Sequence, residues 1–146
     1  MAERISGLAM DLTDAEDLCA YARFCHNKTG RVWDLTERSD DPKLKAEAIK
    51  QSGNCPAGRL VAWEKNAATP IEPRLKPSLG LIEDPQKKVS GPLWAKGGIE
   101  IVSADGKTYE RRNRVTLCRC GQSKNKPFCD GCHASAGFND GDASLK

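Results

Sequence analysis

The spacing of hydrophobic residues in the first half of the chain predicts two helices. Thr13 and Glu16 form a capping-box pattern, so we expect a helix from Asp14 to about Phe24. A second helix is expected to begin at Asp41-Pro42 and end at Gly53, because Pro favours the first helical position and Gly favours the end. Its buried stripe would consist of Leu44, Ala48 and Ile49.

Other stretches of the chain predict strands and a turn. Residues 31–35 alternate between polar and apolar positions and predict a short strand, as does the apolar run 60–63. Residues 67–92 contain five of the eight prolines, which favours an extended connector. Residues 98–112 predict a hairpin that turns at Asp105-Gly106.

Composition and charge narrow the class of protein. The 146 residues are 38% hydrophobic and 5% aromatic, which is enough for one ordinary domain or two small ones with a thin core. A net charge of +3 with no long basic run does not favour nucleic acid as a partner. No apolar stretch approaches the length of a membrane span or of a secretory signal, so we expect a cytoplasmic protein without membrane attachment.

Cysteine is the unusual component of this sequence. The chain contains seven cysteines, an odd number that rules out complete internal pairing. In a reducing compartment, such a count favours metal or redox chemistry over structural disulfides. Both histidines, His26 and His133, directly follow a cysteine, so they also lie beside candidate ligands.

The C-terminal cysteines have the spacing of a metal site. Cys118 and Cys120 are one residue apart and can direct two sulfurs to one metal from an extended segment. Cys129 supplies a third sulfur, and a helical turn would place His133 on the same face as Cys129. Thiolates and imidazole are the ligands that hold iron–sulfur clusters or zinc.

This stretch resembles the CDGSH iron–sulfur family, of which mitoNEET is a member. Eight positions keep the spacing of the family pattern, and only Cys132 departs from it, because the family usually has Ser, Ala or Thr there. The resemblance implies a [2Fe-2S] cluster with three cysteine ligands and one histidine ligand. The matching positions are Cys118, Cys120, Ser123, Pro127, Cys129, Asp130, Gly131 and His133, of which Cys118, Cys120, Cys129 and His133 would be the ligands and Ser123, Asp130 and Gly131 would support them.

Two other interpretations apply to these residues. The ligand types also suit a Cys3His zinc site. However, only one residue separates Cys118 from Cys120, whereas two to four residues usually separate the cysteines of a zinc knuckle. Cys132 is either a small packed residue or a thiol that becomes an alternative ligand if His133 dissociates. A histidine ligand coordinates only when its nitrogen is unprotonated, so acid is expected to loosen this site more readily than an all-cysteine one.

The N-terminal cysteines form a weaker pattern. Cys19 and Cys25 are separated by five residues, and Cys55 precedes a proline. This arrangement resembles the single-cluster ferredoxins and the divergent mono-cluster domain that often accompanies CDGSH motifs. The resemblance implies a [3Fe-4S] cluster on the three cysteines or a [4Fe-4S] cluster with a further ligand, for which His26 is the local candidate. The alternatives are packed thiols, a zinc site or a redox disulfide.

The surroundings of the motifs bear on partners and activity. Seven basic residues lie between positions 107 and 126 with only Glu110 opposing them, which favours docking of an acidic redox partner. The sequence has no nucleophile elbow, phosphate-binding loop or dinucleotide fingerprint, and we do not expect an enzyme.

Together these features predict a small α+β iron–sulfur protein in two parts. A ferredoxin-like region at 8–66 with helices and short strands is followed by the connector at 67–92 and a β-rich CDGSH domain at 93–140. The expected function is one-electron transfer. The alternatives are a cluster carrier or redox and pH sensor that delivers its cluster to an apo acceptor, and a zinc-stabilised interaction module. The family resemblance also implies a homodimer.

Overall fold

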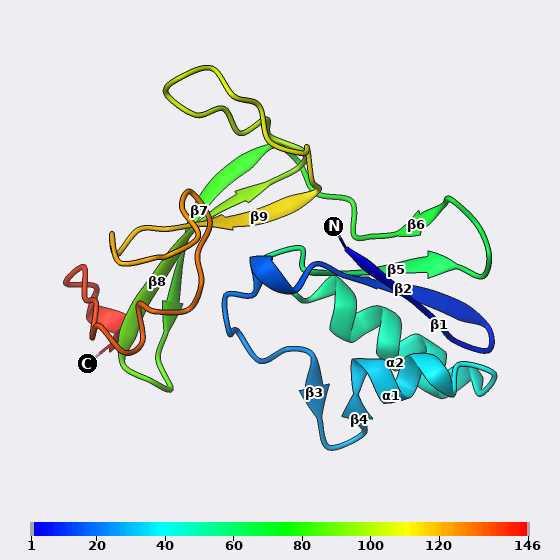
Figure 1. Cartoon of the computed structure of the whole chain (residues 1–146). Helices are drawn as coiled ribbons and strands as arrows, with labels where there is room; N and C mark the ends of the chain where they lie inside the picture. Colours follow the sequence, from blue (N-terminus) through cyan, green and yellow to red (C-terminus); the bar gives the residue numbers. More distant parts are fainter. Residues whose placement is uncertain (1, 146) are drawn as a thin grey trace. The chain divides into compact units, whose positions relative to one another are not determined.

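A computed structural model describes residues 2–145, which fall into two compact units (Figure 1). The first unit comprises residues 2–16 and 22–74, and the second comprises residues 17–21 and 75–145. Helices occur in the first unit, and the second is built on a β-sheet. This mixture of helices and small antiparallel sheets confirms the predicted α+β class.

The first unit contains an antiparallel sheet with two helices. The sheet order is β1-β2-β5-β6, so β2 and β5 are its central strands. A short β3–β4 ribbon precedes the helices. The elements are β1 (Glu3–Ser6), β2 (Met10–Asp14), the 3-10 turn η1 (Glu16–Leu18), β3 (His26–Asn27), β4 (Gly30–Arg31), α1 (Val32–Glu37), α2 (Pro42–Gly53), β5 (Leu60–Glu64) and β6 (Pro70–Ile71).

The core of this unit forms where the helices pack on one face of the sheet. Alternate residues of β2 and β5 point toward α1 and α2, as the period of two in a strand requires. Burial of these side chains supplies the main apolar stabilisation of the unit. The core residues are Met10, Leu12, Val32, Leu35, Ala48, Leu60 and Ala62.

Two of the predicted elements here are confirmed. Helix α2 begins after Asp41, whose carboxylate accepts a hydrogen bond from the Lys43 amide at 2.8 Å, and Pro42 occupies its first turn. Ala48 is fully buried on the predicted apolar stripe. Strand β5 covers the predicted run 60–63.

Two other predictions were wrong. The capping-box residue Thr13 lies in β2, where its hydroxyl accepts a hydrogen bond from the Trp63 indole at 2.8 Å, and only the three-residue 3-10 turn η1 follows in place of an α-helix. Tyr21 and Arg23 adopt left-handed φ angles of 56° and 67°, which would end a helix. The predicted strand at 31–35 is instead the start of α1, because Val32 and Leu35 are buried at helical spacing.

The second unit is built on an antiparallel sheet of order β7-β8-β9. Residues 67–92, predicted as an extended connector, contain β6, β7 and the start of β8. Pro92 has no amide hydrogen to donate to a neighbouring strand. It is accommodated in β8 because the pairing with β7 is irregular opposite Ile82. The elements are β7 (Ser78–Asp84), β8 (Val89–Lys96), β9 (Arg114–Leu117) and the 3-10 turn η2 (Ala143–Leu145).

The predicted hairpin at 98–112 is only partly formed. The turn is present, since the Ser103 amide donates to the Lys107 carbonyl at 2.9 Å and Gly106 has a φ of +87°. The flanking segments make a single bridge between Val102 and Thr108 and form no regular strands. Among the described residues, no helix is long and apolar enough to cross a membrane.

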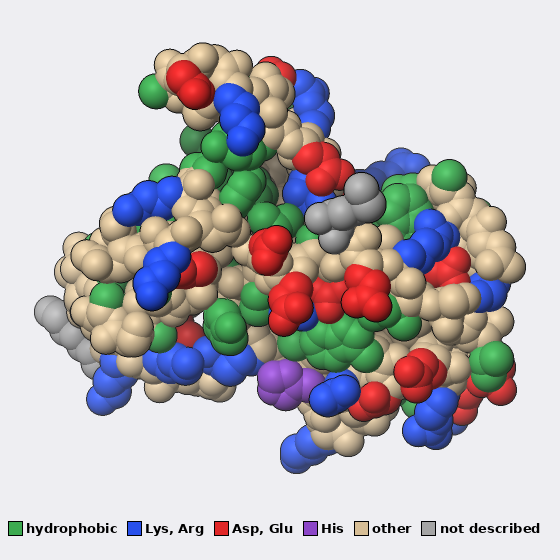
Figure 2. Space-filling view, viewed as in Figure 1, with side chains coloured by type: hydrophobic (Ala, Val, Ile, Leu, Met, Phe, Trp, Pro, Cys, Tyr) green, Lys and Arg blue, Asp and Glu red, His purple; other side chains and the backbone are tan. Residues whose placement is uncertain are grey.

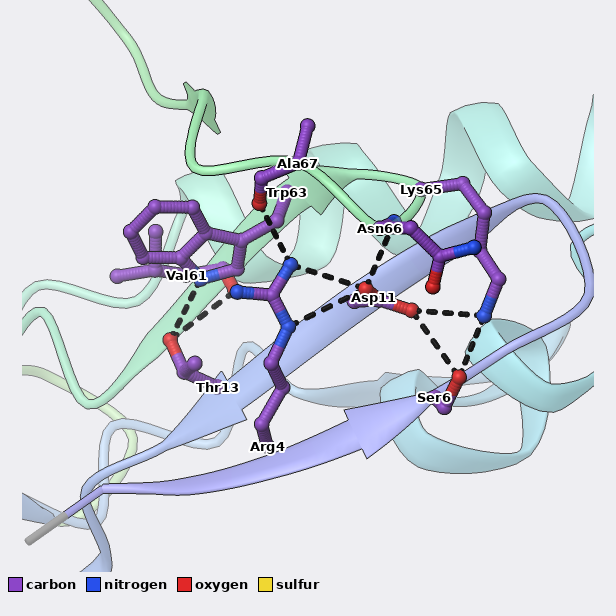
Figure 3. Close-up of polar contacts among 9 residues, drawn as sticks. All are labelled: Arg4, Ser6, Asp11, Thr13, Val61, Trp63, Lys65, Asn66 and Ala67. Atoms are coloured by element: carbon purple, nitrogen blue, oxygen red, sulfur yellow. Dashed lines mark hydrogen bonds and ion pairs between the residues drawn. The ribbon is translucent and has the colours of Figure 1, made fainter.

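A buried carboxylate organises the sheet face that carries Arg4 and Trp63 (Figure 3). The Asp11 side chain is 3% exposed and accepts hydrogen bonds from Arg4 at 2.9 Å, Lys65 at 3.0 Å and the Asn66 amide at 3.1 Å. The Arg4 guanidinium also stacks over the Trp63 ring at 5.2 Å. Burial raises the pKa of Asp11, but the hydrogen bonds from Lys65, Arg4 and the Asn66 amide outweigh it and lower this pKa to about 2.

We therefore expect Asp11→Asn to lower the free energy of unfolding at pH 7 by about 2 kcal/mol, because it leaves Arg4 and Lys65 without a charged partner. The folded pKa lies below the unfolded value of about 3.9, so the contribution is full above roughly pH 4 and is lost as the pH falls toward 2. Urea denaturation at several pH values measures it. Asp34→Asn, in an exposed pair with Arg31, is the control, and equal effects of the two variants would contradict the account.

Candidate metal centre

Strand β9 positions the C-terminal cysteine loop. The chain leaves β9 at Leu117 and turns back, so that Phe128 bridges to Leu117. The Cys118 amide donates to the Pro127 carbonyl at 2.8 Å, and the Cys129 amide donates to the Thr116 carbonyl at 3.0 Å. Two cysteines eleven residues apart in sequence are thereby fixed at the end of the same strand.

The candidate ligand atoms lie in two pairs. The Cys118 and Cys120 sulfurs are 4.0 Å apart, and the Cys129 sulfur lies 3.5 Å from Nδ1 of His133. Metal–sulfur bonds of about 2.3 Å in a tetrahedral set place neighbouring donors roughly 3.8 Å apart. Each pair therefore has the spacing of two ligands on one metal. Within residues 2–145, no group of three or more His, Cys, Asp or Glu side chains is arranged to hold a single metal ion.

Backbone amides also point at two of the sulfurs. The Gln122 amide donates to the Cys120 sulfur at 3.5 Å, and the Gly131 amide donates to the Cys129 sulfur at 3.4 Å. Amide donors stabilise thiolate charge, which is the form that binds a metal. The loop therefore both positions the candidate ligand sulfurs and supplies hydrogen bonds to two of them.

Ser123 and Asp130 hold the loop between the ligands. The Ser123 hydroxyl donates to the Phe128 carbonyl at 2.6 Å and accepts from the Asn125 amide at 3.0 Å. Asp130 accepts from the Lys124 amide at 2.9 Å and from the Cys132 amide at 3.1 Å. The pKa of Asp130 is lowered, mainly by hydrogen bonding from Cys132 and then from the Lys124 amide, so it remains an acceptor.

Gly131 is required by both conformation and space. Its φ of +86° lies in the left-handed region, and a side chain there would collide with the ring of Tyr21, which belongs to the same unit. The segment 17–21 is further attached by the Asn125 side chain, which donates to the Asp17 carbonyl at 2.7 Å. The sequence offered no sign that Tyr21 lies beside this loop, since 110 residues separate it from Gly131.

Arg119, between the first two candidate ligands, anchors the loop to the sheet. Its side chain is 13% exposed and donates to the Gly91 carbonyl at 2.8 Å, the Glu83 carboxylate at 2.9 Å and the Asp140 carboxylate at 2.7 Å. Burial lowers the pKa of Arg119, but the two carboxylates raise it overall. Sequence reasoning counted Arg119 only as a positive charge, and no sequence pattern identified its acidic partners.

Burial shifts the pKa values of the thiols and of the imidazole, and at Cys118 hydrogen bonds outweigh it. Burial raises the pKa of Cys129 to about 11, and burial followed by Asp130 and Cys120 raises that of Cys132 to about 12. At Cys118, burial acts in the same direction, but the amides of Ser123 and Gly121 outweigh it and lower the pKa. Burial lowers the pKa of His133, so its imidazole stays neutral, as a ligand must be, in more acidic solution than a free histidine.

The predicted basic surroundings are partly neutralised. Arg119 is paired with acids, Arg111 lies 3.8 Å from Glu100, and Arg112 lies 3.1 Å from Glu110. Arg114 is 1% exposed and does not contribute to the surface. Figure 2 shows Lys and Arg side chains on the surface interspersed with acidic ones. The exposed positive charges on the loop itself are Lys124 and Lys126.

The three N-terminal cysteines are distributed over both units. Cys25 and Cys55 pack against the core of the first unit, and the Cys25 sulfur lies 3.7 Å from Nδ1 of His26. Cys19 lies in the segment 17–21 that belongs to the second unit. A cluster on Cys19, Cys25 and Cys55 therefore stays a prediction.

Comparison with known proteins gives two family matches and defines the class. Residues 5–65 match the model described as "Divergent 4Fe-4S mono-cluster", and residues 90–134 match the "Iron-binding zinc finger CDGSH type". Neither curated proteins nor solved structures give a match. The class is that of the iron–sulfur proteins. Within it, the chain combines a region that matches the divergent mono-cluster model with a later region that matches the CDGSH model, in the order that the two cysteine motifs predict.

The Arg119 anchor yields a prediction for cluster retention. Arg119→Ala removes the bonds that hold the segment between Cys118 and Cys120, so we expect the bound cluster to be lost about 10- to 100-fold faster in the presence of a chelator. The rate of cluster loss from Arg119→Lys should lie between the rates of Arg119→Ala and wild type, because an ammonium group keeps the charge but not the planar set of donors of a guanidinium. Decay of the visible absorption measures the rate. Arg111→Ala, which removes an exposed pair, is the control, and wild-type retention by Arg119→Ala would refute the role.

Proposed function

We propose that the CDGSH domain holds a [2Fe-2S] cluster on Cys118, Cys120, Cys129 and His133 and that the protein transfers single electrons. The observation that carries this proposal is the arrangement of the donor atoms in two pairs, at 4.0 Å and 3.5 Å. Two irons with two protein ligands each need two such pairs. When bound, the cluster would supply one-electron redox chemistry.

The protein's own residues would determine how the cluster behaves. Three thiolates and one imidazole carry less negative charge than four thiolates, which favours the reduced state and raises the reduction potential. The amides of Gln122 and Gly131 act in the same direction by stabilising charge on sulfur. The CDGSH centre is therefore suited to accept an electron.

An anaerobic redox titration followed by EPR tests this function. Wild type should show one reversible one-electron couple for the CDGSH centre. His133→Cys should keep a cluster but move its potential down by roughly 100 mV or more, because a fourth thiolate adds negative charge. An irreversible loss of the cluster on reduction of wild type would refute electron transfer.

The redox partner is proposed to be an acidic protein that docks at the cluster loop. Lys124 and Lys126 are exposed on this loop. The loop that carries them is held by hydrogen bonds from the Lys124 amide to Asp130 and from the Cys118 amide to the Pro127 carbonyl. Opposite charges on a partner would steer its approach. The docking surface consists of the loop rather than the whole basic stretch predicted from the sequence.

The charge reversal Lys124→Glu/Lys126→Glu should therefore slow electron exchange with an acidic one-electron donor such as a plant-type ferredoxin. We expect about a tenfold decrease at low ionic strength and little difference at high salt, where charges are screened. Stopped-flow absorption measures the rate. Lys28→Glu/Lys43→Glu changes the net charge equally at exposed sites of the first unit, and an identical slowing by this control would argue against docking at the loop.

A cluster carrier is a second candidate, favoured by the histidine in the Cys129–His133 pair. A neutral imidazole is a weaker-held ligand than a thiolate, so this side of the site would open first. Transfer of the cluster to an apo ferredoxin tests it. Fast transfer by wild type and slow transfer by His133→Cys would support the carrier, whereas equal rates would leave electron transfer as the function.

A further inference from the structure

Cys132 lies beside a candidate ligand on the other side of the loop. Its sulfur is 3.7 Å from the sulfur of Cys120, closer than the 4.0 Å between Cys118 and Cys120. Both side chains are partly buried, and both cysteines are free thiols. The residue that departs from the CDGSH pattern is thus placed against the second cysteine of that pattern, twelve positions earlier in the sequence.

The backbone around Cys132 holds this placement. The Cys132 amide donates to Asp130 at 3.1 Å, and its carbonyl accepts from the Ala136 amide at 2.9 Å and from the Ser135 hydroxyl at 3.1 Å. Cys120 is held on its side by Arg119 and by the Gln122 amide that donates to its sulfur. The two thiols therefore approach one another as a consequence of the loop's own hydrogen bonds.

Cys129 is the other cysteine close to Cys132 in the sequence. Cys129 and Cys132 form a C-x-x-C motif, which is the spacing of redox-active dithiols. In the structure, however, Cys129 is 4% exposed and its sulfur faces His133 and the Gly131 amide. The sulfur contact of Cys132 is made with Cys120 instead.

We propose that Cys120 and Cys132 form a reversible disulfide when the site holds no cluster. The oxidant is a low-molecular-weight disulfide such as oxidised glutathione. One thiol of the pair attacks it, releasing one glutathione thiol, and the second thiol then attacks the mixed disulfide, releasing the other. The glutathione disulfide is reduced to two thiols, and the protein dithiol is oxidised to one disulfide.

This modification would control loading of the site, and the inference rests on the proposed ligand set. Formation of the disulfide brings the two sulfurs from 3.7 Å to a bonding distance of about 2.05 Å. The bonded Cys120 sulfur is no longer a thiolate, so it cannot serve as a ligand. The oxidised apo protein is then unable to take up metal at the Cys118–Cys120 pair until a thiol reductant restores both thiols. A Ser, Ala or Thr at position 132, as is usual in the family, would lack this control.

Peptide mapping of the apo protein tests the bond directly. The full chain is freed of iron, incubated for hours at pH 8 with oxidised glutathione, alkylated and digested without reduction. We expect a cross-linked peptide pair joining Cys120 to Cys132, which disappears after reduction. A bond between Cys129 and Cys132 or between Cys118 and Cys120, or alkylation of all four thiols, would overturn the proposal.

Binding of Co²⁺ alone tests the consequence for loading. Reduced wild-type apo protein should show thiolate-to-cobalt absorption from the C-terminal site, the oxidised protein should lose the part contributed by the Cys118–Cys120 pair, and reduction should restore it. Cys132→Ser and Cys132→Ala, treated in the same way, should keep it, and they leave the N-terminal cysteines unchanged. Equal loss of cobalt binding in wild type and in both variants would overturn the proposal.

The two proposals fail in different ways. If the reconstituted wild-type protein holds no inorganic sulfide, the proposed [2Fe-2S] function fails, whatever the mapping shows. If the wild-type protein holds the cluster but its oxidised apo form lacks the Cys120–Cys132 bond, only the disulfide fails.

Discussion

The guanidinium of Arg119 is the interaction on which the geometry of the metal centre depends most. It lies between Cys118 and Cys120 and binds the carboxylates of Glu83 and Asp140 and a carbonyl of β8. Because this charge is largely buried and paired on both sides, removing it would leave the partly buried carboxylates of Glu83 and Asp140 without their cationic partner. The C-x-C segment thereby becomes a rigid extension of the sheet, and the amides around Ser123 and Asp130 fold the remainder of the loop around it.

The two units are stabilised by different means. In the first, apolar residues of α1, α2 and the central strands form a conventional core, and the buried Asp11 network occupies the strand positions that point away from it. In the second, charged and polar residues are themselves interior. Arg114 and Ser90 are buried, and Arg119 links the cysteine loop to the hairpin of β7 and β8. A chain with few aromatic residues thus completes a small unit with ion pairs and hydrogen bonds, and a bound cluster would add further cross-links.

The sequence predicted the parts whose signals are local. Helix α2 carries its cap, its proline and its apolar stripe within twelve residues, and the CDGSH motif carries its donor residues within sixteen. Prediction from the sequence was wrong where contacts between distant residues determine the structure. Thr13 looks like a helix cap but is drawn into β2 by strands on both sides, and β7 forms among prolines because β8 pairs with it. The anchoring of Arg119 by Glu83 and Asp140, the position of Tyr21 against Gly131 and the meeting of Cys120 with Cys132 all depend on such long-range contacts.

The most direct test of the account is the ratio of iron to inorganic sulfide in the purified protein, measured in anaerobically prepared wild type and in a variant with Cys118 and Cys129 replaced by Ser. If the C-terminal donor pairs hold a [2Fe-2S] cluster, the variant loses equal amounts of iron and sulfide, about two of each per chain. The same iron and sulfide content in both proteins, or loss of zinc without sulfide, would contradict the central claim.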